Sequence, residues 1–179
     1  MTLRIRSRAF GALPFLLGAV LLAAFASPPA TAAPSVRLIA KLPTSFGVPT
    51  NVTTYEPSLA QLSKHVPPGS GISLVDVESL AVPDARDALK HHAWTGFLRI
   101  HPDPAVLKGE GQRIGLSAVV LCKSGGDMAG MTATCYLVDL GTDTQFEVSD
   151  QWDPRMSRDS AQVLEDLIGG LLARYSNRP

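Results

Sequence analysis

The sequence predicts a single α+β domain, in which a strand-helix-strand-helix unit precedes an antiparallel β-meander and a C-terminal amphipathic helix packed on the sheet. Runs with strand spacing and helix spacing alternate over residues 35–92, whereas residues 94–152 contain β-rich runs with short connections. A repeat of apolar residues at spacings of three and four over 164–175 predicts the closing helix. We expect this domain to span residues 33–179.

Residues 1–32 have the features of a secretory signal peptide. Three arginines within residues 4–8 precede an uncharged run over 10–26, and residues 30–32 match the A-x-A site of signal peptidase. Cleavage before Ala33 is therefore expected, and an uncleaved anchor is the alternative. No cysteine lies near the cut, which argues against a lipid-anchored form. We expect a periplasmic or secreted protein without a stable membrane span after cleavage.

The charge balance argues against a nucleic-acid partner. Residues 1–32 contain three of the 16 basic residues and none of the 16 acidic ones, so the remainder carries a formal charge of −3. Its basic residues stand singly along the chain instead of forming a patch. This composition indicates a mixed, solvated surface.

The first elements are predicted from local spacing and turn residues. Residues 35–42 alternate as a strand and are followed by a Pro- and Gly-rich loop over 43–49, with a short extended piece over 51–55. Pro57 is expected at the first position of a helix over 58–66.

The next two elements complete the strand-helix-strand-helix unit. Residues 71–80 predict a strand covered on both sides, because apolar side chains fall on both of its faces. Asp84 is then expected to cap a helix that runs to His92.

The meander is predicted as four strands over 94–101, 113–123, 132–140 and 145–152. The turn signal over 141–144 makes the pairing of the last two the firmest long-range contact.

The terminal helix is expected to begin with Asp159 and Gln162 as a capping pair. Gly169 and Gly170 lower its helix propensity by about 2 kcal/mol relative to alanine, so close packing against the sheet is expected there. Its apolar stripe consists of Leu164, Leu167, Ile168, Leu171, Leu172 and Tyr175.

Cys122 and Cys135 are the only two cysteines, and they bracket a glycine-rich segment between two β-rich runs. An even count in an exported protein favours a disulfide, which would staple a hairpin near its tip. Two buried free thiols are the alternative.

The segment between the cysteines is the best candidate for a contact surface. Gly125, Gly126, Met128 and Met131 are predicted to form a flexible, exposed tip, and adaptable apolar side chains such as those of methionine suit partner docking. A mobile tip without a partner is the alternative interpretation.

Two short motifs and the order of elements resemble bacterial envelope accessory domains, namely the curli-secretion lipoprotein, the lipoprotein activators of penicillin-binding proteins and the amino-terminal domain of the Tol translocation protein. The motifs lie at 88–98, where a helix ends and a strand begins, and at 136–148, in the hairpin before the last helix. Trp94 replaces the usual Asp of the first motif, and the usual lipidated cysteine is absent. The resemblance implies an α+β envelope domain that binds other proteins.

No catalytic residue, cofactor site or metal site is predicted. His91 and His92 are adjacent, so on a helix their side chains diverge by about 100° and do not share one metal easily. The favoured function is therefore an exported envelope accessory protein that acts by binding a protein partner, without catalysis. The alternative is a small periplasmic or secreted hydrolase or metal-dependent enzyme built from the dispersed residues His65, His91, His92, His101, Asp84 and Asp103.

Overall fold

A computed structural model describes residues 36–46, 55–95, 101–127, 130–153, 155 and 159–178. The contacts of the chain divide it into two units, residues 1–32 and 33–179, and every described residue belongs to the second. No helix within the described ranges is long and apolar enough to cross a membrane.

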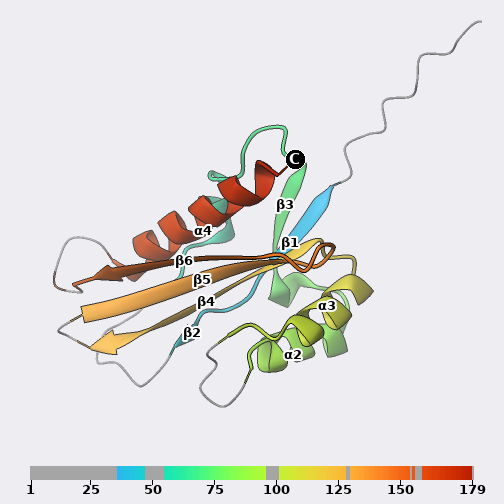
Figure 1. Ribbon diagram of the computed structural model, residues 1–179, viewed down its shortest axis with the longest axis horizontal. Coiled ribbons are helices and arrows are strands. Elements are labelled where there is room, and N and C mark those ends of the chain that lie inside the picture. Colours follow the sequence, from blue (N-terminus) through green and yellow to red (C-terminus); the bar gives the residue numbers. More distant parts are fainter. Residues whose placement is uncertain are drawn as a thin grey trace, which may run out of the picture. The chain divides into compact units, whose positions relative to one another are not determined.

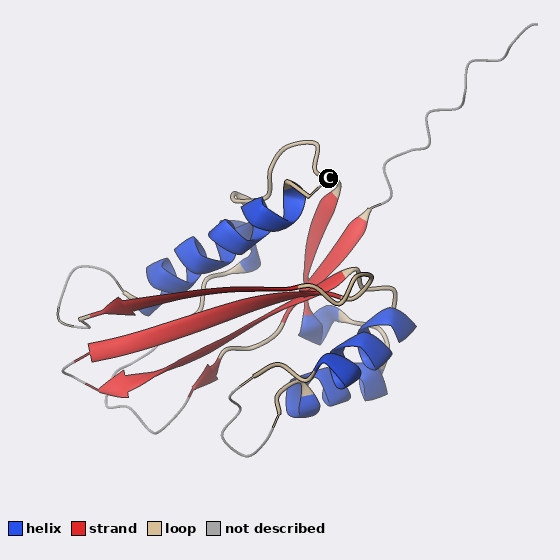
Figure 2. Ribbon diagram, viewed as in Figure 1, coloured by secondary structure: helices blue, strands red, loops and turns tan. Residues whose placement is uncertain are grey.

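The described residues form a six-stranded mixed sheet with helices packed on it (Figures 1 and 2). Its strands are β1 (Arg37–Lys41), β2 (Ser45–Phe46), β3 (Ile72–Asp76), β4 (Ala118–Asp127), β5 (Gly130–Asp139) and β6 (Gln145–Trp152). The helices are α1 (Leu59–Ser63), α2 (Pro83–His92), α3 (Pro104–Arg113) and α4 (Ser160–Ser176), with a 3-10 turn, η1, over Val77–Ser79. The predicted α+β class, the β4–β5–β6 meander and the closing helix are confirmed.

The strand order is β3-β1-β4-β5-β6, and β2 pairs with β4 beyond the end of β1. β1 lies parallel to both β3 and β4, whereas β4, β5 and β6 are antiparallel neighbours. Among the described strands, β6 and β3 are therefore the outer members of this order, and β2 is the outer strand beside β4 beyond the end of β1.

Helices cover the sheet on both faces, so that two apolar clusters form. Leu62 of α1 and Ile168 of α4 belong to the cluster on one face, and Leu89 of α2 and Leu107 of α3 belong to the cluster on the other. α4 lies on the opposite side of the sheet from α2 and α3 in Figure 1. Side chains of β4 and β5 alternate between the clusters, as Leu137 and Tyr136 do.

Several predicted boundaries in the first half differ from the structure. Pro57 precedes the helix, because Ser58 is the N-cap and forms a capping box with Gln61. Asp84 lies inside the first turn of α2, and Val82 is the N-cap without a side-chain bond. The strand expected over 71–80 ends at Asp76, whose carboxylate accepts the N–H of Glu78 at 3.0 Å as η1 begins.

The segment after β1 also differs from the prediction. The loop expected over 43–49 contains β2, which pairs with β4. Pro43 lies between β1 and β2 and has no N–H to donate to the ladder. The extended piece expected over 51–55 lies outside the described residues, apart from Tyr55.

A helix, α3, was missed between the predicted strands of the meander. Asp103 caps it by accepting the N–H groups of Ala105 and Val106, and Pro104 occupies its first turn. This Asp-Pro pair was the available signal. The strand predicted over 94–101 is wrong at its ends, since Trp94 forms only a single bridge with Pro102, while 96–100 lie outside the described residues.

The strand predicted over 113–123 begins later than expected. Arg113 ends α3, and Gly115 follows at a φ of +79°, a conformation that favours glycine, before β4 starts at Ala118.

The capping of α4 is as predicted, because Asp159 accepts the N–H of Gln162 at 2.8 Å. The role of its two glycines differs. A Cβ at Gly169 would lie 2.8 Å from Nδ1 of His65, so this glycine makes room for the residue that follows the C-cap of α1 and not for the sheet, whereas Gly170 faces open space.

Candidate functional site

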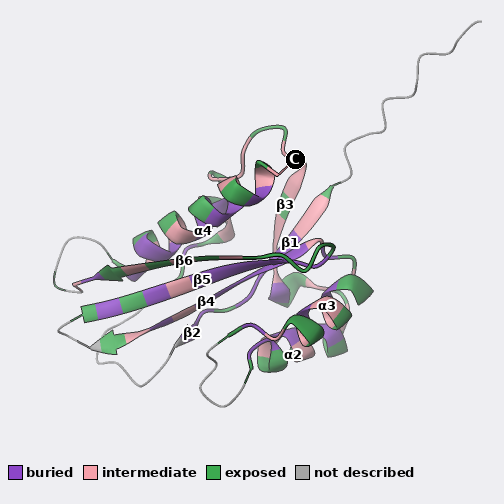
Figure 3. Ribbon diagram, in the orientation of Figure 1, coloured by how far each residue is buried: buried purple, intermediate pink, exposed green. Residues whose placement is uncertain are grey.

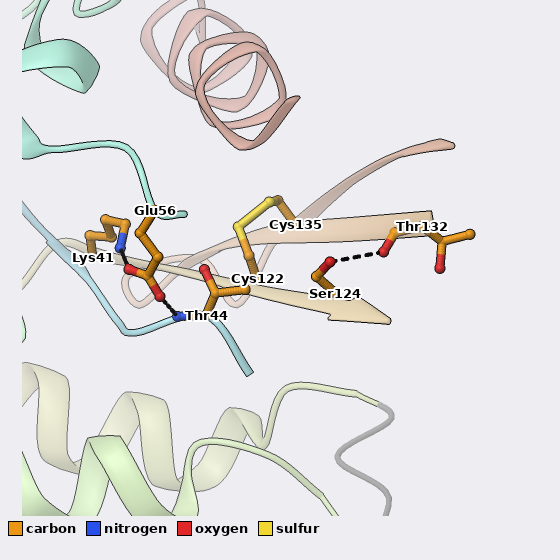
Figure 4. The surroundings of a disulfide bond; sticks show 7 residues. All are labelled: Lys41, Thr44, Glu56, Cys122, Ser124, Thr132 and Cys135. Atoms are coloured by element: carbon orange, nitrogen blue, oxygen red, sulfur yellow. Dashed lines mark hydrogen bonds and ion pairs between the residues drawn. A yellow bond between two sulfur atoms is a disulfide. The ribbon is translucent and has the colours of Figure 1, made fainter. Parts of the chain in front are cut away.

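The two cysteines occupy facing positions on β4 and β5 and are joined by a disulfide (Figure 4). Their Cα atoms are 4.1 Å apart, and both residues are buried on the face of the sheet that α4 covers. The N–H of Leu140 donates to the carbonyl of Ser117 at 3.0 Å, so these two residues form a hydrogen-bonded pair of the β4–β5 ladder. Hydrogen-bonded and non-hydrogen-bonded pairs alternate along an antiparallel ladder. Cys122 and Cys135 are therefore a non-hydrogen-bonded pair. Such pairs bring side chains close enough to bond.

The structure places three of the four residues of the predicted contact tip, whose role in partner binding stays a prediction. Gly125 and Gly126 belong to β4 and pair with Thr132 and Met131 of β5, so these two glycines lie in a strand and not in a loop. Met131 is only 1% exposed and belongs to the cluster under α4, because the pleat directs it to the same face as Cys135. Met128 lies outside the described residues.

The histidines and carboxylates of the alternative, enzymatic hypothesis have separate local roles. His65 contacts Glu165 of α4 at 2.9 Å, Asp103 caps α3, and His91 and His92 are exposed at the end of α2. Within the described residues, no group of three His, Cys, Asp or Glu side chains could hold a metal ion.

A hollow of about 190 Å³ borders His91, below the usual volume of ligand pockets. Its described lining contains neither a carboxylate nor a second histidine: Leu42, Pro43, Thr44, Ser45, Lys90, His91 and Trp94. The arrangement therefore does not form an acid-base pair.

The exposed strand β6 has the geometry of a protein-binding site. The N–H of Asp139 donates to the carbonyl of Thr144 at 2.9 Å, and the register pairs Leu137 with Phe146 and Cys135 with Val148. The even-numbered residues of β6 thus bond to β5, and the odd-numbered residues direct their N–H and C=O groups outward. Within the described chain, no hydrogen bond reaches the outward backbone groups of Glu147 and Ser149.

The edge of β6 lacks most of the usual devices against strand pairing, although Asp150 on its α4 side is an inward-pointing charged residue of the kind that discourages pairing. Natural edge strands are shortened, bulged or protected by Lys and Pro. β6 is eight residues long, its register with β5 is continuous, and its sequence QFEVSDQW contains neither Lys nor Pro. An extended segment of another chain could therefore add to it.

The two faces of β6 differ in chemistry. On the face opposite α4, the side chains of Gln145, Glu147, Ser149 and Gln151 are all exposed. On the α4 side, Phe146 and Val148 are half-buried and pack against the apolar cluster, and the half-buried carboxylate of Asp150 follows them. Figure 3 shows this alternation along β6.

The turn that presents β6 is held by a buried carboxylate. Asp139 accepts the N–H groups of Gly141 and Thr142 at 2.8 Å each and forms an ion pair with Arg178. The guanidinium of Arg178 also lies 4.7 Å from the ring centre of Phe146. Burial by itself raises the pKa of Asp139, but these hydrogen bonds and the charge of Arg178 outweigh it, so the pKa is lowered.

A second ion pair, between the buried Lys41 and the more accessible Glu56, holds the segment before α1 to the sheet. Nζ of Lys41 lies 2.5 Å from Oε2 of Glu56, and the N–H of Thr44 donates to Oε1 of the same carboxylate (Figure 4). Burial raises the pKa of Glu56, but the bonds and charge of Lys41 and the bonds of Thr44 lower it by more. Both carboxylates are bound by fixed partners and have structural roles.

No family model matches the chain, and no curated protein matches it. Among solved structures, it is similar to the LpoB C-terminal domain from Salmonella enterica, with 12% identity and a TM-score of 0.42, covering 69% of this chain and 87% of that one. It is also similar to TolB from Acinetobacter baumannii, with 10% identity and a TM-score of 0.43, covering 79% of this chain and 28% of that one. A third similar structure is lipoprotein GNA1162 from Neisseria meningitidis, with 16% identity and a TM-score of 0.40, covering 78% of this chain and 96% of that one. These are bacterial envelope accessory domains, the group that the sequence resembles. At these identities and TM-scores, the likeness supports no conclusion about function.

Proposed function

We propose that this protein is a bacterial envelope accessory protein that binds a partner protein by strand pairing at the edge of β6. The observation that carries the proposal is the outward backbone of Glu147 and Ser149 on a long, unbulged edge strand. Main-chain hydrogen bonds supply affinity in this mode, and the alternating side chains supply selectivity. No catalytic step is part of the proposal.

Export is the second part of the proposal. The arginines, uncharged run and A-x-A site of residues 1–32 support removal of a signal peptide and a periplasmic or secreted location for residues 33–179. The intact mass of the protein recovered from the extracytoplasmic fraction tests this. A chain that begins at Ala33 agrees with the proposal, whereas a full-length chain in the membrane pellet contradicts it.

Strand pairing is tested by a substitution that removes one outward donor. Ser149→Pro deletes an N–H that makes no bond to β5, so the protein should still fold. Ser149→Ala is the matched control, because it keeps the N–H. A photo-crosslinking residue at position 145 should give an adduct in the native envelope that Ser149→Ala retains and Ser149→Pro loses.

A crosslinker at position 84, in the first turn of α2 and outside β6, is the positional control. Adducts from position 84 but not from position 145 contradict the proposal. Adducts from position 145 that survive Ser149→Pro, with thermal melts showing both variants folded, also contradict it.

A further inference from the structure

The pleat of β6 determines which face each side chain of an added strand would occupy. Residues directly opposite one another in neighbouring strands have their side chains on the same face. A partner residue opposite Glu147 therefore joins the exposed polar face, and the residues on either side of it, opposite Phe146 and Val148, join the α4 face. Three consecutive partner residues thus alternate between two environments: the α4 face, the polar face and the α4 face again.

The α4 face favours apolar partner side chains. Phe146, Val148 and Leu167 of α4 pack against the apolar cluster but remain half-buried. Glu165 and Gly169 turn toward His65, and Leu167 is about 160° around the helix from both, so it lies on the flank away from α1. The side chains of an added strand would remove this apolar surface from water.

The opposite face favours a basic partner side chain. Glu147 is exposed and has no ion pair among the described residues, and its neighbours on this face, Gln145 and Ser149, are neutral. Lys123 of β4 lies across β5, 5.7 Å from the ring centre of Tyr136. An opposite charge beside Glu147 is stabilising, and a like charge is not.

The ladder available to the partner ends near Gln151. The outward N–H of Gln151 already donates to Oδ1 of Asp150 at 2.8 Å, which leaves Gln145, Glu147 and Ser149 as the outward donors. Glu147 is the middle one. Resting on the proposed function, we infer that the partner strand carries an apolar-basic-apolar triplet, with its Lys or Arg beside Glu147.

This chemistry also argues against β6 of a second copy of the chain as the occupant. The corresponding triplet of β6 is Phe146-Glu147-Val148, which is apolar-acidic-apolar. Pairing two β6 strands brings acidic side chains together and supplies no basic one.

A displayed library of peptides with eight randomised residues tests the inference on the purified protein. Binders are selected on the protein and then sorted by loss of binding to Ser149→Pro with retention on Ser149→Ala. Among the sorted peptides, we expect enrichment of Lys or Arg between two apolar residues. For a resynthesised binder, Glu147→Lys should weaken binding about fivefold or more, and replacing the central basic residue by Glu should restore it. Asp84→Lys, in α2, is the control for net charge.

The outcomes separate the inference from the proposed function. The inference is overturned, and strand pairing is left in place, by two results. One is a set of binders that depend on the N–H of Ser149 but are not enriched in Lys or Arg between apolar residues. The other is a set of such binders whose affinity is unchanged by Glu147→Lys. If no binder distinguishes Ser149→Pro from Ser149→Ala, strand pairing at β6 and the inference are both overturned.

Discussion

The two ends of β5 are covered differently, although they belong to one strand. Tyr136, Leu137 and Val138 are all buried, because α4 covers one face there and α2 and α3 cover the other. Over Gly130–Thr134, buried residues alternate with exposed or half-buried ones (Figure 3). Complete coverage at one end stabilises the domain, and the polar face at the other end stays in contact with solvent, as does the outer strand β6.

The largest effect is expected from truncation at the doubly covered end. Leu137→Ala and Leu121→Ala each delete a fully buried side chain, one from each apolar cluster, and each should destabilise the protein by about 2–5 kcal/mol. Urea unfolding measures both. If Leu137→Ala lowers the free energy of unfolding and Leu121→Ala leaves it nearly unchanged, the face under α2 and α3 does not act as a core, and the comparison fails.

The next effect concerns the disulfide, which lies at the boundary between the two ends. The Cys122→Ala/Cys135→Ala double variant should fold but lose about 2–4 kcal/mol, since the bond closes a loop with a sequence separation of 13. Denaturant melts under non-reducing conditions measure the loss. Equal stability of the variant and the oxidised parent would show that packing alone holds the strands together.

A smaller effect is expected at the turn that follows the covered end. Asp139→Asn removes the charge from a buried hydrogen-bonded carboxylate and should cost about 1–3 kcal/mol. Because the folded-state pKa of Asp139 is lowered, its contribution is present above its ordinary pKa of 3.8 and is lost as the pH falls through the folded value.

The urea midpoint of the parent should therefore drop between pH 5 and strongly acidic conditions, and Asp139→Asn should reduce this drop. Asp143→Asn, which touches an exposed ion pair with Lys108, is the matched control and should leave the profile unchanged. Identical pH profiles for the parent and Asp139→Asn would mean that Arg178 and the turn do not stabilise the charged carboxylate.

The smallest effect is expected on the open polar face. Thr132→Ala and Gln151→Ala should change the free energy of unfolding by about 0.5 kcal/mol or less, because both side chains are exposed. Denaturation curves of the two variants test this. A cost near that of Leu137→Ala would show that a further part of the protein covers this face.

Local signals predicted part of this structure before any tertiary contact was known. The pairing of β5 with β6 follows from two alternating runs around a four-residue turn, and α4 follows from an apolar repeat and the Asp159 cap. α3 was missed because its apolar stripe is weak and Gly109 and Gly111 lower its propensity, even though the Asp103-Pro104 signal was present. For the candidate site, the spacing predicted the strand β6 but not that its odd-numbered residues direct their backbone groups outward, because this depends on which segments pair with it.

The sequence by itself determined the α+β class, the meander and the closing helix, since these depend on residues close together in the chain. Tertiary structure decided that Ile39 pairs in parallel with Ala118, that Met131 faces the core and that Gly169 accommodates His65. These features depend on segments far apart in sequence, for which spacing carries no signal. The open edge of β6 has the same origin, because a strand is an edge only when no other segment of the fold pairs with it.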